Sequence, residues 1–197
     1  MEAAVPWRVR QRAALLVDIR RTAHHLFAER GFDAVTTEDI ATAVGISPST
    51  FFRHVSSKEG LLVEPVLEHI SGLVAAYEYR PRTEDAGTAL VAAMIDHMRE
   101  PRADDITMWL NAIRSAPHLI GRVTLVNAGD RARLVELAAE RMTLDDPSDL
   151  RPALLVQIVL AASEYVFQQW IAGTAPAEPP LPEQVRSALT TVLTADW

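Results

Sequence analysis

The sequence contains no cysteine and a single lysine, Lys58. Without thiols the chain can form no disulfide, no thiolate metal site and no cysteine nucleophile, which is easiest to reconcile with a reducing cytoplasm. Residues 1–12 show no apolar segment of the kind that directs secretion, and the longest apolar run is too short and too interrupted to span a bilayer. We therefore expect a soluble, cytoplasmic protein without a membrane partner.

Sequence motifs of catalysis and metal binding are also missing. The six histidines are scattered, and the chain has no HExxH motif, nucleophile elbow or glycine-rich phosphate loop. Two clusters, Glu64–Glu68–His69 and Asp96–His97, could imitate a metal site or an acid–base pair, but such residues most often lie on a solvated helix face. The sequence therefore predicts a protein that is not an enzyme and that has no catalytic residue, cofactor or metal ion.

Strand-like alternation of apolar and polar residues is absent, and helical periodicity predicts an all-α chain. With 197 residues, 49% of them hydrophobic, the chain is long enough for the cores of one or two domains. A kink is expected near Leu61, because Pro65 lacks a backbone donor, and a break is expected near 127–129. Proline and glycine joints divide the chain into about nine helices: 10–30, 37–44, 48–55, 57–79, 84–99, 104–115, 118–142, 148–172 and 183–194.

Residues 36–58 are the most informative segment, because start and stop signals define two short helices around a tight turn. Thr36 can cap the first helix, and Asp39, three residues later, completes a capping box. Gly45 can take the left-handed conformation that ends this helix. Ser47 followed by Pro48 is a start signal for the second helix.

A helix, a glycine-containing turn and a second helix form the pattern of a helix-turn-helix, whose second helix lies in the major groove of DNA. An ordinary corner between two helices has the same pattern. In the second helix Phe51 and Val55, at positions i and i+4, are expected to face inward. The residues left facing mostly outward are Ser49, Thr50, Arg53 and His54.

Particular residues in and around this segment favour the helix-turn-helix. They are LFAERGF at 26–32, TT at 36–37, IA at 40–41, GIS at 45–47, STFF at 49–52, SKE at 57–59 and LL at 61–62. At this spacing, residues 12–65 resemble the N-terminal domain of TetR-type transcriptional repressors. The resemblance implies an N-terminal three-helix helix-turn-helix domain, 1–58, and a C-terminal helical domain for ligand binding and dimerisation, 59–197. It also implies a homodimeric repressor that leaves a palindromic operator in double-stranded DNA when a small hydrophobic effector binds.

The resemblance and the side-chain chemistry together give a set of expected DNA contacts. Thr36, Thr37 and the start of the second helix present hydroxyl and N–H groups to phosphates. Ser49, Thr50 and Arg53 are placed for base edges in the major groove. The complete expected set is Thr36, Thr37, Ser47, Pro48, Ser49, Thr50, Phe52, Arg53, His54 and Lys58.

Two of these positions decide how closely the expected site follows the family. Lys58 matches the family's phosphate-contacting lysine. At Phe52 the family usually has a tyrosine that resembles a phosphate anchor, and this hydroxyl donor is missing here. Arg53, His54 and Lys58 can supply backbone contacts instead. The alternative function is a helical ligand-binding or scaffolding protein with vestigial DNA binding.

The charge of the chain is divided unevenly. The net charge is −7, but residues 1–60 carry eight Arg and Lys against seven Asp and Glu, whereas residues 61–197 carry eleven against nineteen. The weakly basic N-terminal part predicts a local positive patch and salt-sensitive binding. Arg8, Arg10 and Arg12 form either an arm that reaches phosphates or the minor groove, or a solvated terminus.

Apolar residues fall on nearly every face of the helix expected at 148–172. A single apolar stripe is enough to cover a core, so this helix needs burial on a second side. Another subunit can provide that second side, with Val159 and Val166 as outer positions. The resemblance points the same way, because TetR-type repressors form homodimers through their last two long helices. The alternative is the central core helix of a monomer.

The C-terminal part has more large apolar residues than its helix packing requires, with polar groups interleaved among them. A mostly apolar pocket with a few orienting polar contacts accounts for both features. The alternative is an ordinary core with the polar groups at the surface. Together with the resemblance, the pattern predicts a ligand site formed by Tyr77, Met94, His97, Met98, Met108, Trp109, Asn111, Arg114, Asn127, Glu164, Tyr165 and Gln168.

Overall fold

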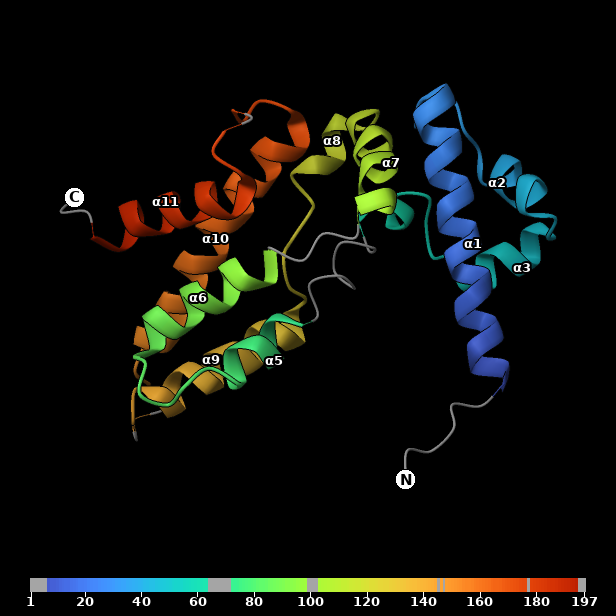
Figure 1. The fold of residues 1–197 in the computed structure, drawn as a ribbon. Coiled ribbons are helices and arrows are strands. Elements are labelled where there is room, and N and C mark those ends of the chain that lie inside the picture. Colours follow the sequence, from blue (N-terminus) through green and yellow to red (C-terminus); the bar gives the residue numbers. More distant parts are fainter. Residues whose placement is uncertain are drawn as a thin grey trace. The chain divides into compact units, whose positions relative to one another are not determined.

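The computed structural model describes residues 7–63, 72–98, 103–144, 146, 148–176 and 178–194. Every regular element in these residues is a helix, which confirms the predicted all-α fold (Figure 1). The chain divides into two compact units. One comprises Met1–Pro65 and Arg102–Arg122, and the other comprises Val66–Pro101 and Val123–Trp197.

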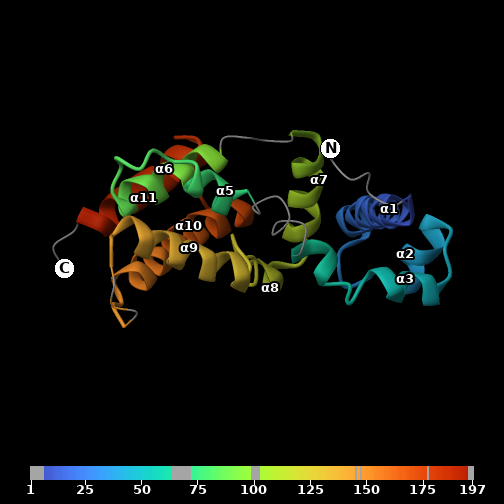
Figure 2. The same ribbon diagram turned by 90° about the horizontal axis from the view of Figure 1, so that it is seen from below.

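The first unit contains α1 (Trp7–Arg30), α2 (Thr37–Val44), α3 (Pro48–His54), α7 (Ala103–Arg114) and α8 (Pro117–Ile120). The pair α2 and α3 lies on one side of α1 and α7 lies on the other, as Figure 1 and Figure 2 both show. Ile19, Ala23 and Phe27, at helical spacing along α1, are fully buried. This stripe makes α1 the central support of the unit.

Helices α2 and α3 begin and end where the local chemistry predicts. The Thr36 side chain accepts the backbone N–H of Asp39, and the Asp39 side chain accepts the backbone N–H of Thr36, so the capping box is complete. Gly45 ends α2 in the left-handed conformation, with φ of 78°. Ser47 caps α3 with its side chain, and Pro48 occupies the first turn.

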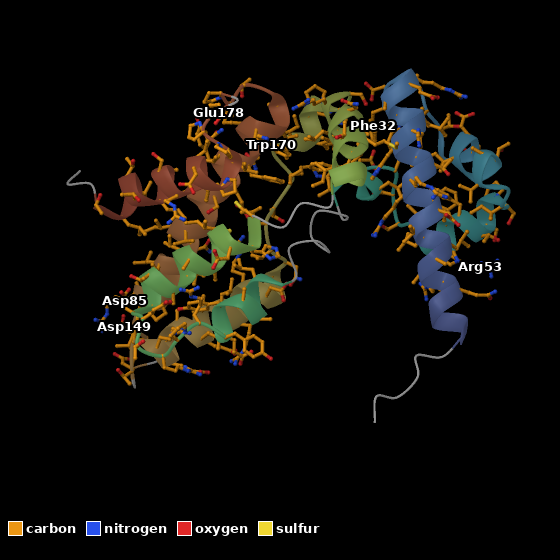
Figure 3. All side chains as sticks on the ribbon, in the orientation of Figure 1. Phe32, Arg53, Asp85, Asp149, Trp170 and Glu178 are labelled. Carbon is orange, nitrogen blue, oxygen red and sulfur yellow. The ribbon has the colours of Figure 1, made fainter. Side chains whose placement is uncertain are left out.

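The first unit includes α7 and α8, which differs from the predicted domain boundary between residues 58 and 59. The indole N–H of Trp109 donates to the carbonyl oxygen of Leu62 at 2.8 Å, and the backbone N–H of Phe32 donates to Oγ of Ser115 at 3.1 Å. The rings of Phe32 and His118 meet edge-on, with centroids 5.8 Å apart. Figure 3 shows Phe32 between α1 and α7. The two hydrogen bonds join residues 47 and 83 positions apart, beyond the reach of local sequence patterns.

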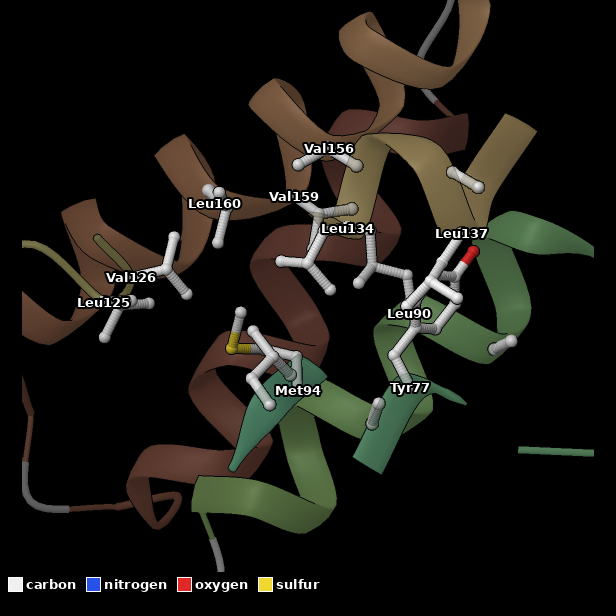
Figure 4. Packing of buried hydrophobic residues seen from close by; sticks show 14 of the residues in the cluster. Tyr77, Leu90, Met94, Leu125, Val126, Leu134, Leu137, Val156, Val159 and Leu160 are labelled. Atoms are coloured by element: carbon white, nitrogen blue, oxygen red, sulfur yellow. The ribbon is translucent and has the colours of Figure 1, made fainter. Parts of the chain in front are cut away.

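The second unit contains α5 (Leu73–Glu78), α6 (Ala86–Met98), α9 (Ala128–Arg141), α10 (Arg151–Ala172) and α11 (Leu181–Thr194). Helix α10 packs against α6, α9 and α11. Figure 4 shows the core, in which Tyr77, Leu90 and Met94 pack near Leu134 and Val159. Each fully buried side chain of this size contributes roughly 1.5–3 kcal/mol, so the cluster is the main source of stability of this unit.

Two expected helices are divided or incompletely described. The helix expected at 118–142 is split into α8 and α9, because Asn127 starts a new helix by accepting the backbone N–H of Asp130 at 2.9 Å. The break expected near 127–129 is thus confirmed. The helix expected at 57–79 is described at residues 60–63 and in α5. Pro65 and the Glu64–Glu68–His69 cluster lie within residues 64–71, outside the described residues, so the helix around the kink expected near Leu61 is described only up to residue 63.

Candidate nucleic-acid interface

Helix α3 has one buried side and one exposed side. Phe51 is fully buried and Val55 is 4% exposed, so these two side chains anchor the helix in the first unit. At about 100° per residue, the exposed residues of α3 fall on the other side. They are Pro48, Ser49, Phe52 and Arg53, and we call them the outward face of α3.

Thr50, expected among the base-reading residues, is half-buried and lies off the outward face. Its Oγ1 atom is 2.9 Å from Oγ of Ser47 and accepts a hydrogen bond from the Arg53 guanidinium at 3.3 Å. Arg53 Nε also donates to the carbonyl oxygen of Ser49 at 3.4 Å. The Arg53 side chain therefore lies back along α3. These hydrogen bonds are long, and Arg53 can exchange them for a base edge at little cost.

Thr36 and Thr37, expected to face phosphates, make hydrogen bonds within the start of α2. The Thr36 hydroxyl donates to Oδ2 of Asp39 at 2.8 Å, and the Thr37 hydroxyl donates to Oε2 of Glu38 at 3.0 Å. The hydrogen bonds from the Thr36 backbone and hydroxyl lower the pKa of Asp39, so this carboxylate stays ionised and keeps the cap closed. Both hydroxyl groups thus serve first to fix the start of α2.

Lys58, expected to contact a phosphate, is held inside the first unit. Its ammonium donates to the carbonyl oxygen of Phe32 at 2.8 Å and to that of Val35 at 3.0 Å. It also lies 4.1 Å from the centroid of the Phe32 ring, which is a cation–π contact. Lys58 therefore joins the connection between α1 and α2 to the chain after α3. A direct phosphate contact would use the third N–H of the ammonium or replace one of these two bonds.

A groove of about 520 Å³ runs between α1 and the end of α3. Its lining residues are Gln11, Arg12, Leu15, Arg53 and His54. The Arg12 guanidinium donates to the carbonyl oxygen of Arg53 at 3.5 Å, and Figure 3 shows Arg53 beside α1. Arg12 and Arg53 together give this groove positive potential next to the outward face. Gln11 and Leu15 could not be predicted from the sequence, because their position beside α3 depends on how α1 crosses α2 and α3.

The residues expected to line a ligand site are divided between the two units. Met108, Trp109, Asn111 and Arg114 belong to α7 in the first unit, where Asn111 and Arg114 are exposed. The other expected residues belong to the second unit. They are Tyr77, Met94, His97, Met98, Asn127, Glu164, Tyr165 and Gln168.

Three expected polar ligand contacts in the second unit bind the protein's own backbone. Glu164 accepts the backbone N–H of Leu125 at 3.1 Å, and Gln168 donates to the carbonyl oxygen of Val123 at 3.2 Å. Asn127 caps α9. These side chains therefore position the segment that enters α9, a use that the alternation of polar and apolar residues does not reveal.

Of the expected apolar contacts in the second unit, Tyr77, Met94 and Met98 share one core cluster and Tyr165 does not. Tyr77 and Met94 are fully buried in the core, whereas Tyr165 is 64% exposed. The Tyr77 hydroxyl donates to the carbonyl oxygen of Ala86 at 3.2 Å, and burial raises the pKa of Tyr77. His97 and Met98, near the end of α6, are half-buried. Within the second unit the structure thus brings Tyr77, Met94 and Met98 together in the core and leaves Tyr165 at the surface.

A groove of about 470 Å³ between α6 and α11 was not expected from the sequence. Val91, Leu155 and Leu189 contribute apolar side chains to it, and Asp85 and Arg186 contribute charged ones. The helical spacing of apolar residues along 181–194 predicts an apolar face on this helix. It does not predict the groove, because the partners on α6 lie about a hundred residues earlier in the chain.

Helix α10 has an exposed apolar side opposite its buried one. Leu154 is 55% exposed, Ile158 38% and Tyr165 64%, and their spacing places them on one side of the helix. Val159 is fully buried, so its expected place at an outer position is wrong. The helix turns Val159 about 100° away from Ile158, towards the core. Val166 is half-buried.

By length and composition, Arg151–Ala172 is apolar enough to cross a membrane, and it alone meets this test in the described part of the chain. The expectation that no segment is long and apolar enough is therefore wrong. Buried helices of soluble proteins pass the same test, and 28% of the most apolar window of α10 is buried within this chain. The rest of this apolar window is not buried within the single chain.

Comparison with known proteins agrees with this geometry. Residues 19–64 match the sequence model of the bacterial regulatory proteins of the tetR family, and residues 84–195 match that of the MftR C-terminal domain. The chain is 28% identical over 188 residues to the HTH-type transcriptional regulator TcmR of Streptomyces glaucescens, with 90% of this chain and 83% of TcmR covered. It is 26% identical over 165 residues to the putative mycofactocin biosynthesis transcriptional regulator MftR of Mycobacterium tuberculosis, with 82% of each chain covered.

A solved structure shows the same fold. Thermus thermophilus FadR, a TetR-family transcriptional repressor in complex with lauroyl-CoA, has a TM-score of 0.55 at 20% identity, with 90% of this chain and 93% of that chain covered. The matched C-terminal model spans more than half of this chain, and the matched N-terminal model contains all of α2 and α3. The chain therefore belongs to the TetR family of DNA-binding transcriptional regulators, which are not enzymes.

Proposed function

We propose that the protein is a homodimeric repressor that binds a palindromic operator through α2 and α3 and leaves it when a small hydrophobic ligand binds. The observation that carries this proposal is the outward face of α3. The face is exposed, while the Ser47 cap and the buried Phe51 fix the helix beneath it. A short helix held in this way can enter the major groove with its side chains already in place.

The proposed contacts are a smaller set than that expected from the sequence, with Arg12 added. Ser49 and Arg53 read base edges, because both lie on the outward face. Thr37, His54 and Arg12 face the phosphates on either side, and Arg12 joins the set because it lines the groove with His54. We assign Lys58 mainly to the support of the fold, because its ammonium donates to two carbonyl oxygens.

The proposed dimer forms through the exposed apolar side of α10. Leu154, Ile158 and Tyr165 lie along one side of a long helix, and Leu193 of α11 is also 40% exposed. A second copy that packs the same surface in a two-fold arrangement removes these side chains from water. A two-fold dimer presents two copies of α3, which requires an operator with two inverted half-sites.

The proposed ligand is hydrophobic and binds the second unit. FadR of Thermus thermophilus, which has a similar fold, is in complex with lauroyl-CoA. Here the interior of the second unit is apolar, and Met94 and Met98 on α6 have unbranched side chains that can rearrange around a guest. The protein acts in the cytoplasm, where its DNA target lies.

Selection from a random duplex library with the full-length protein tests the proposal. Enrichment of one inverted repeat is expected, and Ser49→Ala or Arg53→Ala should weaken binding to it by about 1–3 kcal/mol each. If the wild-type protein enriches no sequence at low salt, the regulator proposal fails and the scaffolding alternative is favoured.

A further inference from the structure

Phe52 is the one aromatic side chain on the outward face of α3, and it is 56% exposed. Single exposed apolar side chains are ordinary on protein surfaces. Phe52, however, lies three residues after Ser49 and directly before Arg53. Its ring therefore belongs to the surface that meets DNA under the proposed function.

The Phe52 ring is also held in place. It packs edge-on against Phe51, with ring centroids 5.5 Å apart and an interplanar angle of 90°. Phe51 is itself fully buried, so the exposed ring is oriented by a fixed neighbour. A phenylalanine side chain has only two torsions, and a ring already packed in this way loses little freedom on binding. The protein thus presents a preorganised apolar contact beside two polar ones.

The chemistry of DNA leaves few groups that match an apolar ring. Phosphate oxygens require donors or positive charge, and a phenyl ring has neither. In the major groove the base edges present donors, acceptors and one apolar group, the 5-methyl of thymine. We propose that Phe52 reads a thymine in each operator half-site through this methyl group. The inference rests on the proposed function, because it needs α3 in the major groove.

The position of that thymine follows from the spacing along α3. Ser49 and Phe52 are separated by three residues, a rise of about 4.5 Å along the helix. Neighbouring base pairs are about 3.4 Å apart along one strand. With α3 lying along the major groove this separation is close to one base-pair step, so we expect the thymine beside the base pair that Ser49 contacts.

Replacing each operator thymine in turn with deoxyuridine tests the inference, because only the methyl group is removed. The operator is first recovered by selection from random duplexes with the full-length protein. Loss of one buried methyl contact corresponds to about a 4-fold weaker Kd. The wild-type protein should show this loss at one thymine of each half-site, and Phe52→Ala should bind the thymine and deoxyuridine duplexes equally. Ser49→Ala is the matched control, and it should keep the wild-type sensitivity.

Three results would overturn the inference while leaving the regulator itself intact. The first is operator binding by the wild type that no deoxyuridine changes. The second is a deoxyuridine effect that persists undiminished in Phe52→Ala. The third is a Phe52→Ala variant that binds operator and unrelated duplexes more weakly by the same factor, because the ring would then lie on the DNA backbone. Circular dichroism confirms that the variant is folded, as expected for an exposed position. A wild-type protein that enriches no sequence counts against the proposed function instead.

Discussion

Nε2 of His24 lies 2.8 Å from the carbonyl oxygen of Leu61, and His24 is only 9% exposed. In a helix the carbonyl of residue 61 accepts the N–H of residue 65, but Pro65 has no N–H. The imidazole on α1 therefore supplies a donor to a carbonyl for which the residue four positions later in the sequence, a proline, has no N–H to offer. The next carbonyl, that of Leu62, receives the indole N–H of Trp109. Side chains of α1 and α7 thus each donate a hydrogen bond to a backbone carbonyl within the helical residues 60–63.

Replacing His24 with phenylalanine should lower the free energy of unfolding by about 1–3 kcal/mol, because a buried carbonyl loses its donor. For a chain of this size each 1 kcal/mol shifts the Tm by about 2–4 °C. His25→Phe is the matched control, because His25 is the exposed neighbour on the same helix. Thermal unfolding followed by circular dichroism compares the two variants. Equal Tm values for both would show that the His24–Leu61 contact contributes nothing.

Substitutions of Lys58 and Arg53 should separate an effect on protein stability from an effect on DNA affinity. Lys58→Ala removes two hydrogen bonds from an ammonium to backbone carbonyls and should lower the free energy of unfolding by about 1–3 kcal/mol. Arg53→Ala removes an exposed side chain and should weaken operator binding while leaving the Tm unchanged. Thermal unfolding and binding at several salt concentrations measure both effects. A Lys58→Ala protein with wild-type Tm and a shallower salt dependence of binding would instead identify Lys58 as a phosphate contact.

The lowered pKa of Asp39 predicts that the stability contributed by the α2 cap depends on pH. Its pKa in the folded protein is lowered from 3.8, first by the hydrogen bond from the Thr36 backbone and then by that from the Thr36 hydroxyl. A lowered pKa contributes stability that is fully present above 3.8 and is lost as the pH falls through the folded value. Asp39→Ala should therefore have a lower Tm than the wild type at pH 7, and the two Tm values should converge below pH 3.8. A difference that stays constant between pH 7 and pH 3 would contradict the role of the ionised carboxylate.

The parts of the structure that the sequence could predict are those decided within a few residues. Thr36, Gly45 and Ser47 fix the ends of α2 and α3 through hydrogen bonds and backbone preferences that span no more than five residues. Lys58 could not be placed in this way. The two carbonyl oxygens that accept its hydrogen bonds lie 26 and 23 residues earlier. The family resemblance suggested instead that Lys58 contacts a phosphate.

Helix α7 is a second case in which a distant contact could not be predicted from the sequence. Its apolar periodicity predicted a helix at about the correct residues, but Trp109 was expected in a ligand site. The partner of Trp109 is the carbonyl of Leu62, 47 residues earlier, and this contact places α7 in the first unit. A buried aromatic residue has the same sequence pattern in a core, at a joint between segments and in a pocket, so periodicity cannot distinguish them.

The proposed dimer predicts opposite effects for neighbouring residues on α10. Leu154→Glu places a charge on the exposed apolar side and should yield a folded monomer, because a buried charge opposes association. Val159→Glu places the charge in the core and should unfold the second unit. Tyr79→Glu is the control, because Tyr79 is 87% exposed at the end of α5, away from the proposed interface. Light scattering should give twice 21.7 kDa for the wild type and Tyr79→Glu, and 21.7 kDa for Leu154→Glu. A wild-type mass of 21.7 kDa at micromolar concentration would rule the dimer out.

Ligand release predicts a reciprocal effect that two titrations can measure. A ligand that weakens operator binding by some factor must itself bind more weakly, by the same factor, when the operator is saturating, and such factors are typically about 5–150. Lauroyl-CoA is the first probe and coenzyme A without an acyl chain is its control, because an apolar interior selects for the chain. Trp170, stacked on Phe167 in the second unit with centroids 5.7 Å apart, is expected to report binding by fluorescence, and Trp170→Phe shows whether the signal comes from this residue. Equal affinities for lauroyl-CoA with and without operator would exclude it as the inducer wherever it binds, because a ligand that does not distinguish the two states cannot shift the equilibrium between them.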